Sequence, residues 1–129
     1  KAEISQAVIA SSRNLLKIIK VIHPEVRLSM HHFLKKNKDK KIVVLDIPLL
    51  LENKINRKKD ILVFIDAKKN EINKRLKKRK NFNYENYRKF KKLQLPIEVK
   101  KKRSDFVIKN DFKNKSIKKN VKRVLEKIL

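Results

Sequence analysis

The sequence predicts an α/β fold in which parallel strands are covered by helices. Two runs of apolar residues, at positions 42–45 and 61–65, are continuous rather than alternating, which is typical of strands buried on both faces of a sheet. Stretches with the 3.6-residue apolar period of helices precede, separate and follow these runs. Strands that alternate with helices pair in parallel, and 129 residues is the length of one domain, so we expect one parallel sheet and one core.

The first 40 residues predict three helices. Apolar residues at positions 4–9 indicate a short helix, and Ser11 or Ser12 can cap the helix that follows. This second helix is expected to end at His23, because a proline disfavours helical geometry in the residue before it. Pro24 suits the first turn of a third helix, which runs into a lysine-rich turn.

The rest of the chain alternates between strands and helices. The first strand is expected at residues 42–46, ending in Asp46, the second at residues 61–65 and a third at residues 105–108. Residues 71–103 form a basic helical excursion with too few apolar residues for a core, and this pattern predicts a mobile flap. The chain closes with a helix whose apolar face comprises Ile117, Val121, Val124, Leu125 and Ile128.

The composition is strongly basic, with 38 Lys and Arg against 13 Asp and Glu and a net charge of +25. Such a charge attracts polyanions. Most of these cations are lysines, however, and the aromatic residues of the flap gather within residues 82–90, where helical spacing indicates a packing cluster. Proteins that read nucleic acids favour arginine forks and stacking aromatics. We therefore expect a solvated basic surface, and a nucleic-acid partner only through non-specific charge.

Cysteine and glycine are both absent from the sequence, and each absence excludes a class of site. Without cysteine the chain has no disulfide or thiolate metal site. Without glycine it contains no glycine-rich loop that cradles phosphates. His31 and His32 have no carboxylate partner at ligand spacing, so a zinc site is not expected. No apolar run approaches the roughly 20 residues that span a bilayer, which predicts a cytoplasmic protein without a membrane partner.

Four segments together resemble the dephospho-CoA kinase family, in the order and at the intervals of that family. They are HPEVR at residues 23–27, LDIPLLLEN at 45–53, NKRLKKR at 73–79 and LQLPIEVKKKRSDFVIKN at 93–110. The resemblance implies a three-layer P-loop kinase-type parallel sheet with helical substrate-binding and lid segments. Family members begin with a strand and a glycine-rich loop, so we expect this chain to be a fragment, incomplete at its N-terminus and inactive alone.

The resemblance also implies a reaction and a division of the chain. The complete enzyme would move the γ-phosphoryl group of ATP, with Mg²⁺, to the 3′-hydroxyl of dephospho-CoA, the last step of coenzyme A synthesis. The alternative is a basic RNA-binding or ribosome-associated protein on a degenerate kinase scaffold. Residues 1–40 would bind dephospho-CoA, 41–79 would form the α/β core, 80–103 the lid, and 104–129 the last core strand and helix.

The candidate ATP-handling residues are one acid, two arginines and one asparagine. Asp46 would end a buried strand at the carboxyl edge of the sheet, where ligands bind, and would act on Mg²⁺ through a bound water. Arg75 and Arg79 lie four residues apart, which places both on one face of a helix. By resemblance Arg75 is catalytic and reaches the ATP phosphates, as does Arg79, and Asn110 lies near the adenine. A solvated basic helix would also explain the arginine pair.

The candidate residues for dephospho-CoA come mainly from the resemblance. Glu52 would either cap the turn that it follows or contact the substrate, and the leucines before it would form an apolar shelf, although packing explains them equally well. A lone histidine before a helix, such as His23, is more often a structural residue than a catalyst. The candidates are His23, Arg27, Pro48, Leu49, Glu52, Gln94 and Lys100.

Overall fold

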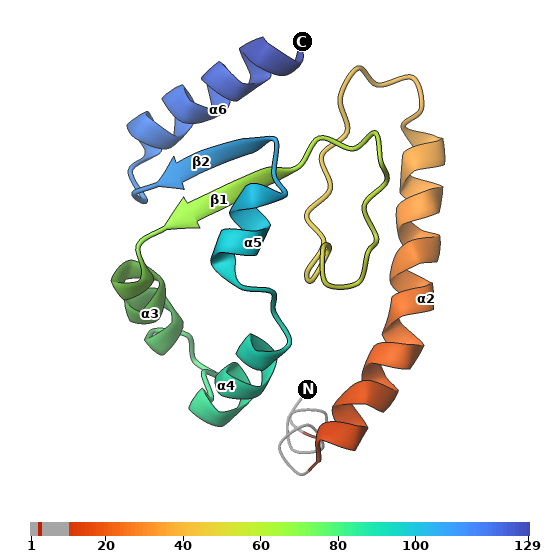
Figure 1. Ribbon diagram of the computed structural model, residues 1–129, viewed down its shortest axis with the longest axis vertical. Helices are drawn as coiled ribbons and strands as arrows, with labels where there is room; N and C mark the ends of the chain where they lie inside the picture. Colours follow the sequence, from red (N-terminus) through yellow and green to blue (C-terminus); the bar gives the residue numbers. More distant parts are fainter. Residues whose placement is uncertain (1–2, 4–10) are drawn as a thin grey trace.

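The computed structural model describes residue 3 and residues 11–129, and its elements follow the order α2, β1, α3, α4, α5, β2, α6 (Figure 1). The short helix predicted at residues 4–9 lies outside the described residues. No helix of the described part is long and apolar enough to cross a membrane.

The sheet consists of two parallel strands, β1 (Val63–Ala67) and β2 (Phe106–Asn110), with Ile65 opposite Ile108. Both strands were predicted, and both begin one or two residues later than predicted. Their continuous apolar runs are separated by helices, which is why they pair in parallel. The predicted α/β class is confirmed.

The first predicted strand, at residues 42–46, is wrong. This segment does not form a strand of the sheet, and Val44 keeps 79% of its surface exposed. Within the described residues the sheet consists of β1 and β2 alone, so the segment has no neighbour that would order its backbone as a strand. Asp46 is therefore exposed on an irregular segment and does not end a buried strand.

Helix α2 (Ser12–Lys36) corrects the prediction of a break at His23 and of a new helix at Pro24, because it runs through both residues. Pro24 removes one internal hydrogen bond of the helix. Its position is exposed, so water can satisfy the carbonyl that this bond would have used. The predicted capping at Ser11 is confirmed, since its hydroxyl accepts a hydrogen bond from the Arg13 N–H at 3.1 Å.

The basic excursion at residues 71–103 is helical, as predicted, and contains three short helices. They are α3 (Lys69–Lys77), α4 (Tyr84–Lys92) and α5 (Ile97–Lys102). The closing helix α6 (Asn114–Ile128) is also confirmed and packs against β2. Figure 1 shows α3 and the start of α6 close to the carboxyl ends of the two strands.

The core of the described part is small. Only Ile55 and Ile108 are buried among the described hydrophobic residues, whereas Ile65 on β1 and Val107 on β2 remain about half exposed. Asp105 fixes the amino end of the sheet, because its carboxylate accepts a hydrogen bond from the Leu62 N–H at 2.7 Å. This hydrogen bond between distant residues joins the two strand entries where few side chains are buried.

Candidate functional site

The carboxyl ends of β1 and β2 bring a cation and an aromatic ring together. In parallel sheets this edge is the usual place for ligands, because the loops that follow neighbouring strands meet there. Arg75, on the helix that follows β1, has its guanidinium carbon 3.9 Å from the centre of the ring of Phe112, which follows β2. Arg75 thus lies on the helix that follows this strand, as the sequence predicted, and its guanidinium is close to this edge of the sheet.

Arg79 does not share a helix face with Arg75, and that prediction is wrong. Helix α3 ends at Lys77, and Arg79 lies in the turn that follows, where its N–H donates to the Leu76 carbonyl at 3.1 Å. The helix ends in a lysine-rich stretch without glycine, so the sequence carries no clear stop signal there. Arg79 instead borders a hollow beside the aromatic cluster of Phe82, Tyr87 and Phe90.

Asn110 is the last residue of β2 and shapes the turn beyond it. Its side-chain oxygen accepts a hydrogen bond from the Phe112 N–H at 2.8 Å. The next residue, Asp111, accepts bonds from the Lys113 N–H at 3.0 Å and from the Ser116 hydroxyl, and these bonds lower the pKa of its exposed carboxyl. Asn110 and Phe112 thus belong to one hydrogen-bonded turn between β2 and α6.

Glu52 and Lys100, both predicted as substrate ligands, contact each other. The Lys100 ammonium lies 2.7 Å from the Glu52 carboxylate, and the two side chains are only 19% and 9% exposed. Glu52 also accepts a hydrogen bond from the Leu95 N–H at 2.9 Å. Burial by itself would raise the pKa of Glu52, but the bonds from Lys100 and Leu95 outweigh it and lower that pKa.

A second ion pair joins α5 to the sheet, and no sequence pattern predicted it. The Lys101 ammonium lies 3.0 Å from the carboxylate of Asp66 on β1. Because Lys100 and Lys101 are adjacent, α5 is tied on one side to the turn that carries Glu52 and on the other to β1. The lid predicted at residues 80–103 is thus anchored at its carboxyl end.

The remaining substrate candidates lie on α2 and on the segments next to α5. Arg27 donates a hydrogen bond to the Asn53 carbonyl at 3.1 Å and so links α2 to the turn that bears Glu52. His23 is half-buried within α2. The other three lie outside the helices: Pro48, Leu49, whose φ of 56° is left-handed, and exposed Gln94.

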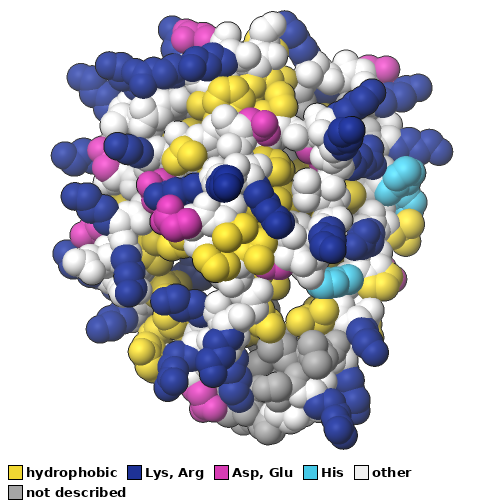
Figure 2. All heavy atoms as spheres, in the orientation of Figure 1, with side chains coloured by type: hydrophobic (Ala, Val, Ile, Leu, Met, Phe, Trp, Pro, Cys, Tyr) yellow, Lys and Arg dark blue, Asp and Glu magenta, His cyan; other side chains and the backbone are white. Residues whose placement is uncertain are grey.

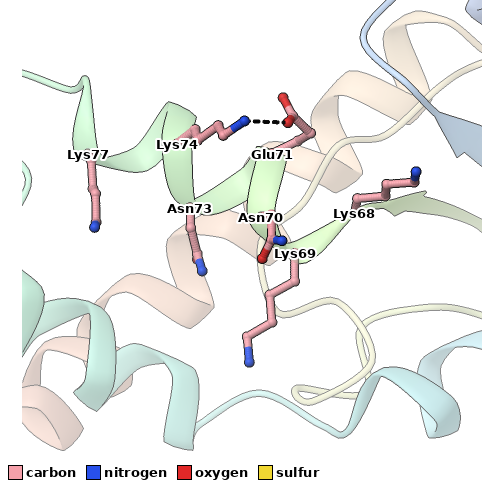
Figure 3. A pocket seen from close by; sticks show the side chains of 7 residues that line it. All are labelled: Lys68, Lys69, Asn70, Glu71, Asn73, Lys74 and Lys77. Atoms are coloured by element: carbon pink, nitrogen blue, oxygen red, sulfur yellow. Dashed lines mark hydrogen bonds and ion pairs between the residues drawn. The ribbon is translucent and has the colours of Figure 1, made fainter.

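Helix α3 also borders a basic hollow of about 750 Å³ on a side that does not include Arg75. Lys69, Asn73 and Lys77 follow at intervals of four residues and project to the same side of the helix (Figure 3). The only carboxylate in its lining, Glu71, pairs with Lys74 at 3.2 Å. The hollow therefore attracts anions. Its lysines, however, all lie on the exposed helix α3 or directly before it, so among the described residues no second element contributes a cation to its lining.

On the face drawn in Figure 2, cations are spread over the surface and do not form a stripe. Figure 2 shows Lys and Arg side chains around the whole visible face, interrupted by apolar patches and by a few carboxylates. A nucleic-acid interface concentrates such residues along one groove or helix. Within the described residues, no group of three or more His, Asp or Glu side chains is placed to hold a metal ion.

Comparisons with known proteins point to one enzyme family. The family model for dephospho-CoA kinase matches residues 1–116. The dephospho-CoA kinase of Wolbachia pipientis wMel is 32% identical over 127 residues, covering 97% of this chain and 65% of the relative. That of Bacillus thuringiensis subsp. konkukian is 31% identical over 131 residues (98% and 64%). That of Fusobacterium nucleatum is 33% identical over 129 residues (99% and 66%). The chain thus spans just under two thirds of these relatives.

Proposed function

This chain belongs to the dephospho-CoA kinase family, and we propose that it takes part in phosphoryl transfer from ATP to the 3′-hydroxyl of dephospho-CoA. In this reaction the hydroxyl oxygen bonds to the γ-phosphorus, the bond from that phosphorus to ADP breaks, and the hydroxyl proton is released. The products are ADP and coenzyme A. The observation that carries the proposal is an exposed arginine, Arg75, at the carboxyl edge of a parallel sheet in a chain of this family.

Arg75 has the chemistry that the reaction needs. Phosphoryl transfer depends mainly on positioning and on positive charge around the transferring group. A guanidinium carries five N–H donors in one plane, and its geometry matches phosphate oxygens. The Arg75 guanidinium carbon lies 3.9 Å from the centre of the Phe112 ring, and its side chain is exposed, so in the proposal its N–H donors are available to ATP. We propose that Arg75 contacts the ATP phosphates, with Arg79 and Asn110 near the nucleotide.

The helical segments would provide the acceptor site and the lid. We propose that residues 1–40, with Arg27 and His23, bind dephospho-CoA, that residues 80–103 act as the lid, and that residues 41–79 and 104–129 form the core. Lys100 would bind a substrate anion while the Glu52 carboxylate holds its ammonium group in place. The hydrogen bond from Arg27 to the turn that bears Glu52, and the ion pair from this turn to α5, connect the two helical segments. Pro48, Leu49 and Gln94 would border the same site.

Magnesium would accompany ATP and neutralise part of its charge. In kinases Mg²⁺ is held by the phosphates, by waters and by one or two carboxylates, not by a cage of side chains. Asp46 fits this requirement, since its carboxylate is exposed and lies two residues before Pro48. In the proposal Asp46 accepts a hydrogen bond from a metal-bound water.

The test is a coupled assay of ADP and coenzyme A formation, using the protein expressed from its complete reading frame. The wild type is expected to form both products only when dephospho-CoA and Mg-ATP are present. Arg75→Ala should lower kcat/KM about 10- to 150-fold, the effect of a lost charged hydrogen bond. Arg123→Ala is the matched control, because Arg123 is also an exposed helical arginine but lies on α6.

Two results would contradict the proposal in different ways. A wild type that forms no coenzyme A would remove the proposed reaction. An Arg75→Ala variant as active as Arg123→Ala would keep the reaction but take Arg75 out of the site. Tight RNA binding that weakens steeply with salt, without any response to dephospho-CoA, would favour the RNA-binding alternative instead.

A further inference from the structure

Phe112 and Arg75 form a contact that neither the sequence patterns nor the proposed reaction explains. Arg75 lies on α3 and Phe112 lies in the connection between β2 and α6, and the guanidinium carbon is 3.9 Å from the ring centre. This distance is well within the range of about 6 Å over which a cation is attracted to an aromatic face. Among the described residues the Arg75 side chain has no ion pair or hydrogen bond of its own, so the ring is its main fixed contact.

The backbone of Phe112 has a conformation that a phenylalanine rarely adopts. Its φ of 61° lies in the left-handed region, where a Cβ atom is crowded by the neighbouring carbonyl. Two hydrogen bonds hold the turn in this form: the Phe112 N–H donates to the Asn110 side chain at 2.8 Å, and the Lys113 N–H donates to the Asp111 carboxylate at 3.0 Å. Strained residues fixed by their surroundings are frequent at functional sites.

The turn that contains Phe112 lies at the carboxyl edge of the sheet, close to the helix that follows β1. Ala67 and Asn110 are paired at the carboxyl ends of β1 and β2, so the segment after β2 meets the helix after β1. The left-handed residue, Phe112, lies in the reversal between β2 and α6, and its ring contacts Arg75 on α3. The ring is half-buried while the arginine is exposed, so the ring is the better-fixed member of the pair.

We propose that Phe112 is a positioning residue for Arg75, which it holds by its guanidinium face so that the N–H edge points to the ATP phosphates. The inference rests on the proposed function. Stacking uses the face of the cation, and hydrogen bonding uses its edge, so the two contacts do not compete. A long arginine side chain loses rotamer freedom when it binds, and a ring that restricts it beforehand lowers that loss.

The experiment compares Phe112→Leu with Phe112→Tyr in the full-length protein. Leucine keeps an apolar side chain but removes the π face, whereas tyrosine keeps the face. Phe112→Leu should lower kcat/KM for ATP about twofold to fivefold, the range for an exposed cation–π contact, and leave the KM for dephospho-CoA unchanged. Phe112→Tyr should stay within about twofold of the wild type. Phe106→Leu, at the opposite end of β2, is the matched control.

A double variant tests whether Phe112 acts through Arg75. If it does, Phe112→Leu added to Arg75→Ala should cause no further loss, because the group being positioned is already absent. A full additional loss in the double variant, or equal kinetics for Phe112→Leu and the wild type, would overturn the inference while leaving the kinase assay of the wild type intact.

A spectroscopic readout separates the contact from the reaction. The Arg75 side-chain Nε–H proton lies near an aromatic face and should show an upfield ring-current shift by NMR in the wild type and in Phe112→Tyr. The shift should disappear in Phe112→Leu and persist in Phe106→Leu. Absence of the shift in the wild type would overturn the positioning role. A wild type with the shift but without phosphoryl transfer would overturn the proposed function instead, with the contact intact.

Discussion

Replacing Glu52 should destabilise the protein much more than replacing an exposed glutamate that forms an ion pair of similar kind. Glu52 accepts two hydrogen bonds, one from the Lys100 ammonium at 2.7 Å and one from the Leu95 N–H at 2.9 Å. A hydrogen bond to a charged group contributes roughly 1.5–3 kcal/mol, and a backbone bond roughly 0.5–1.5 kcal/mol. Loss of both in Glu52→Ala therefore predicts a decrease of about 2–4.5 kcal/mol in the free energy of unfolding.

The matched control is Glu71→Ala. Glu71 pairs with Lys74 at 3.2 Å, but the two side chains are 43% and 70% exposed, so water replaces the lost contact and the expected cost is below about 1 kcal/mol. Glu52 and Lys100 are only 9% and 19% exposed, which leaves the ammonium poorly solvated when its partner is removed. Urea unfolding of the full-length protein, followed by circular dichroism, measures both variants. Equal midpoints for Glu52→Ala and Glu71→Ala would refute the reasoning.

Two more predictions follow from the same contacts and from the exposed surface. Because hydrogen bonds lower the pKa of folded Glu52, its stabilising effect should be present above its unfolded pKa of about 4.3 and be lost as the pH falls through the folded value. The difference in unfolding free energy between wild type and Glu52→Gln should therefore be constant from pH 7 to 6 and shrink below about pH 4.5; a pH-independent difference would contradict this. The 129 residues expressed alone should self-associate, because the chain exposes 11,342 Å² whereas a compact protein of this mass exposes roughly 7,200 Å². A monomer in sedimentation analysis with a sharp thermal transition would argue against this expectation.

Local sequence patterns predicted the helices and strands whose formation depends mainly on the residues within them. The continuous apolar runs located β1 and β2, and the period of 3.6 located α6, because each reports which faces an element must bury. The prediction of a strand at residues 42–46 relied on the same kind of pattern and was wrong. An apolar run records a need for burial, but it does not show whether a neighbouring strand is present to pair with it. The prediction of a break at Pro24 was wrong, because the sequence does not show that Pro24 has an exposed, solvated position within α2.

Sequence patterns predicted candidate site residues as individual positions, but not the contacts that these residues make. The spacing and the family resemblance placed Arg75 on the helix after a strand, which is where it lies. The partners of these residues are distant in sequence: Glu52 and Lys100 are 48 positions apart, and Arg75 and Phe112 are 37 apart. The sequence signal for the left-handed conformation of Phe112 is the pair Asn110 and Asp111 before it, because both residue types tend to form side-chain turns.

The Glu52–Lys100 pair has a consequence for the proposed reaction, because the two residues cannot play equivalent roles toward an anionic substrate. A lysine ammonium has three donors, and Glu52 uses one of them, so Lys100 can meet a substrate phosphate while it keeps its partner. A phosphate placed next to Glu52 itself would be repelled by a carboxylate that its hydrogen bonds keep ionised. In the proposed site, then, Lys100 is the residue that faces substrate, and Glu52 fixes its direction. Since Glu52 also binds the Leu95 N–H, the entry to α5 and the ammonium are positioned by one carboxylate.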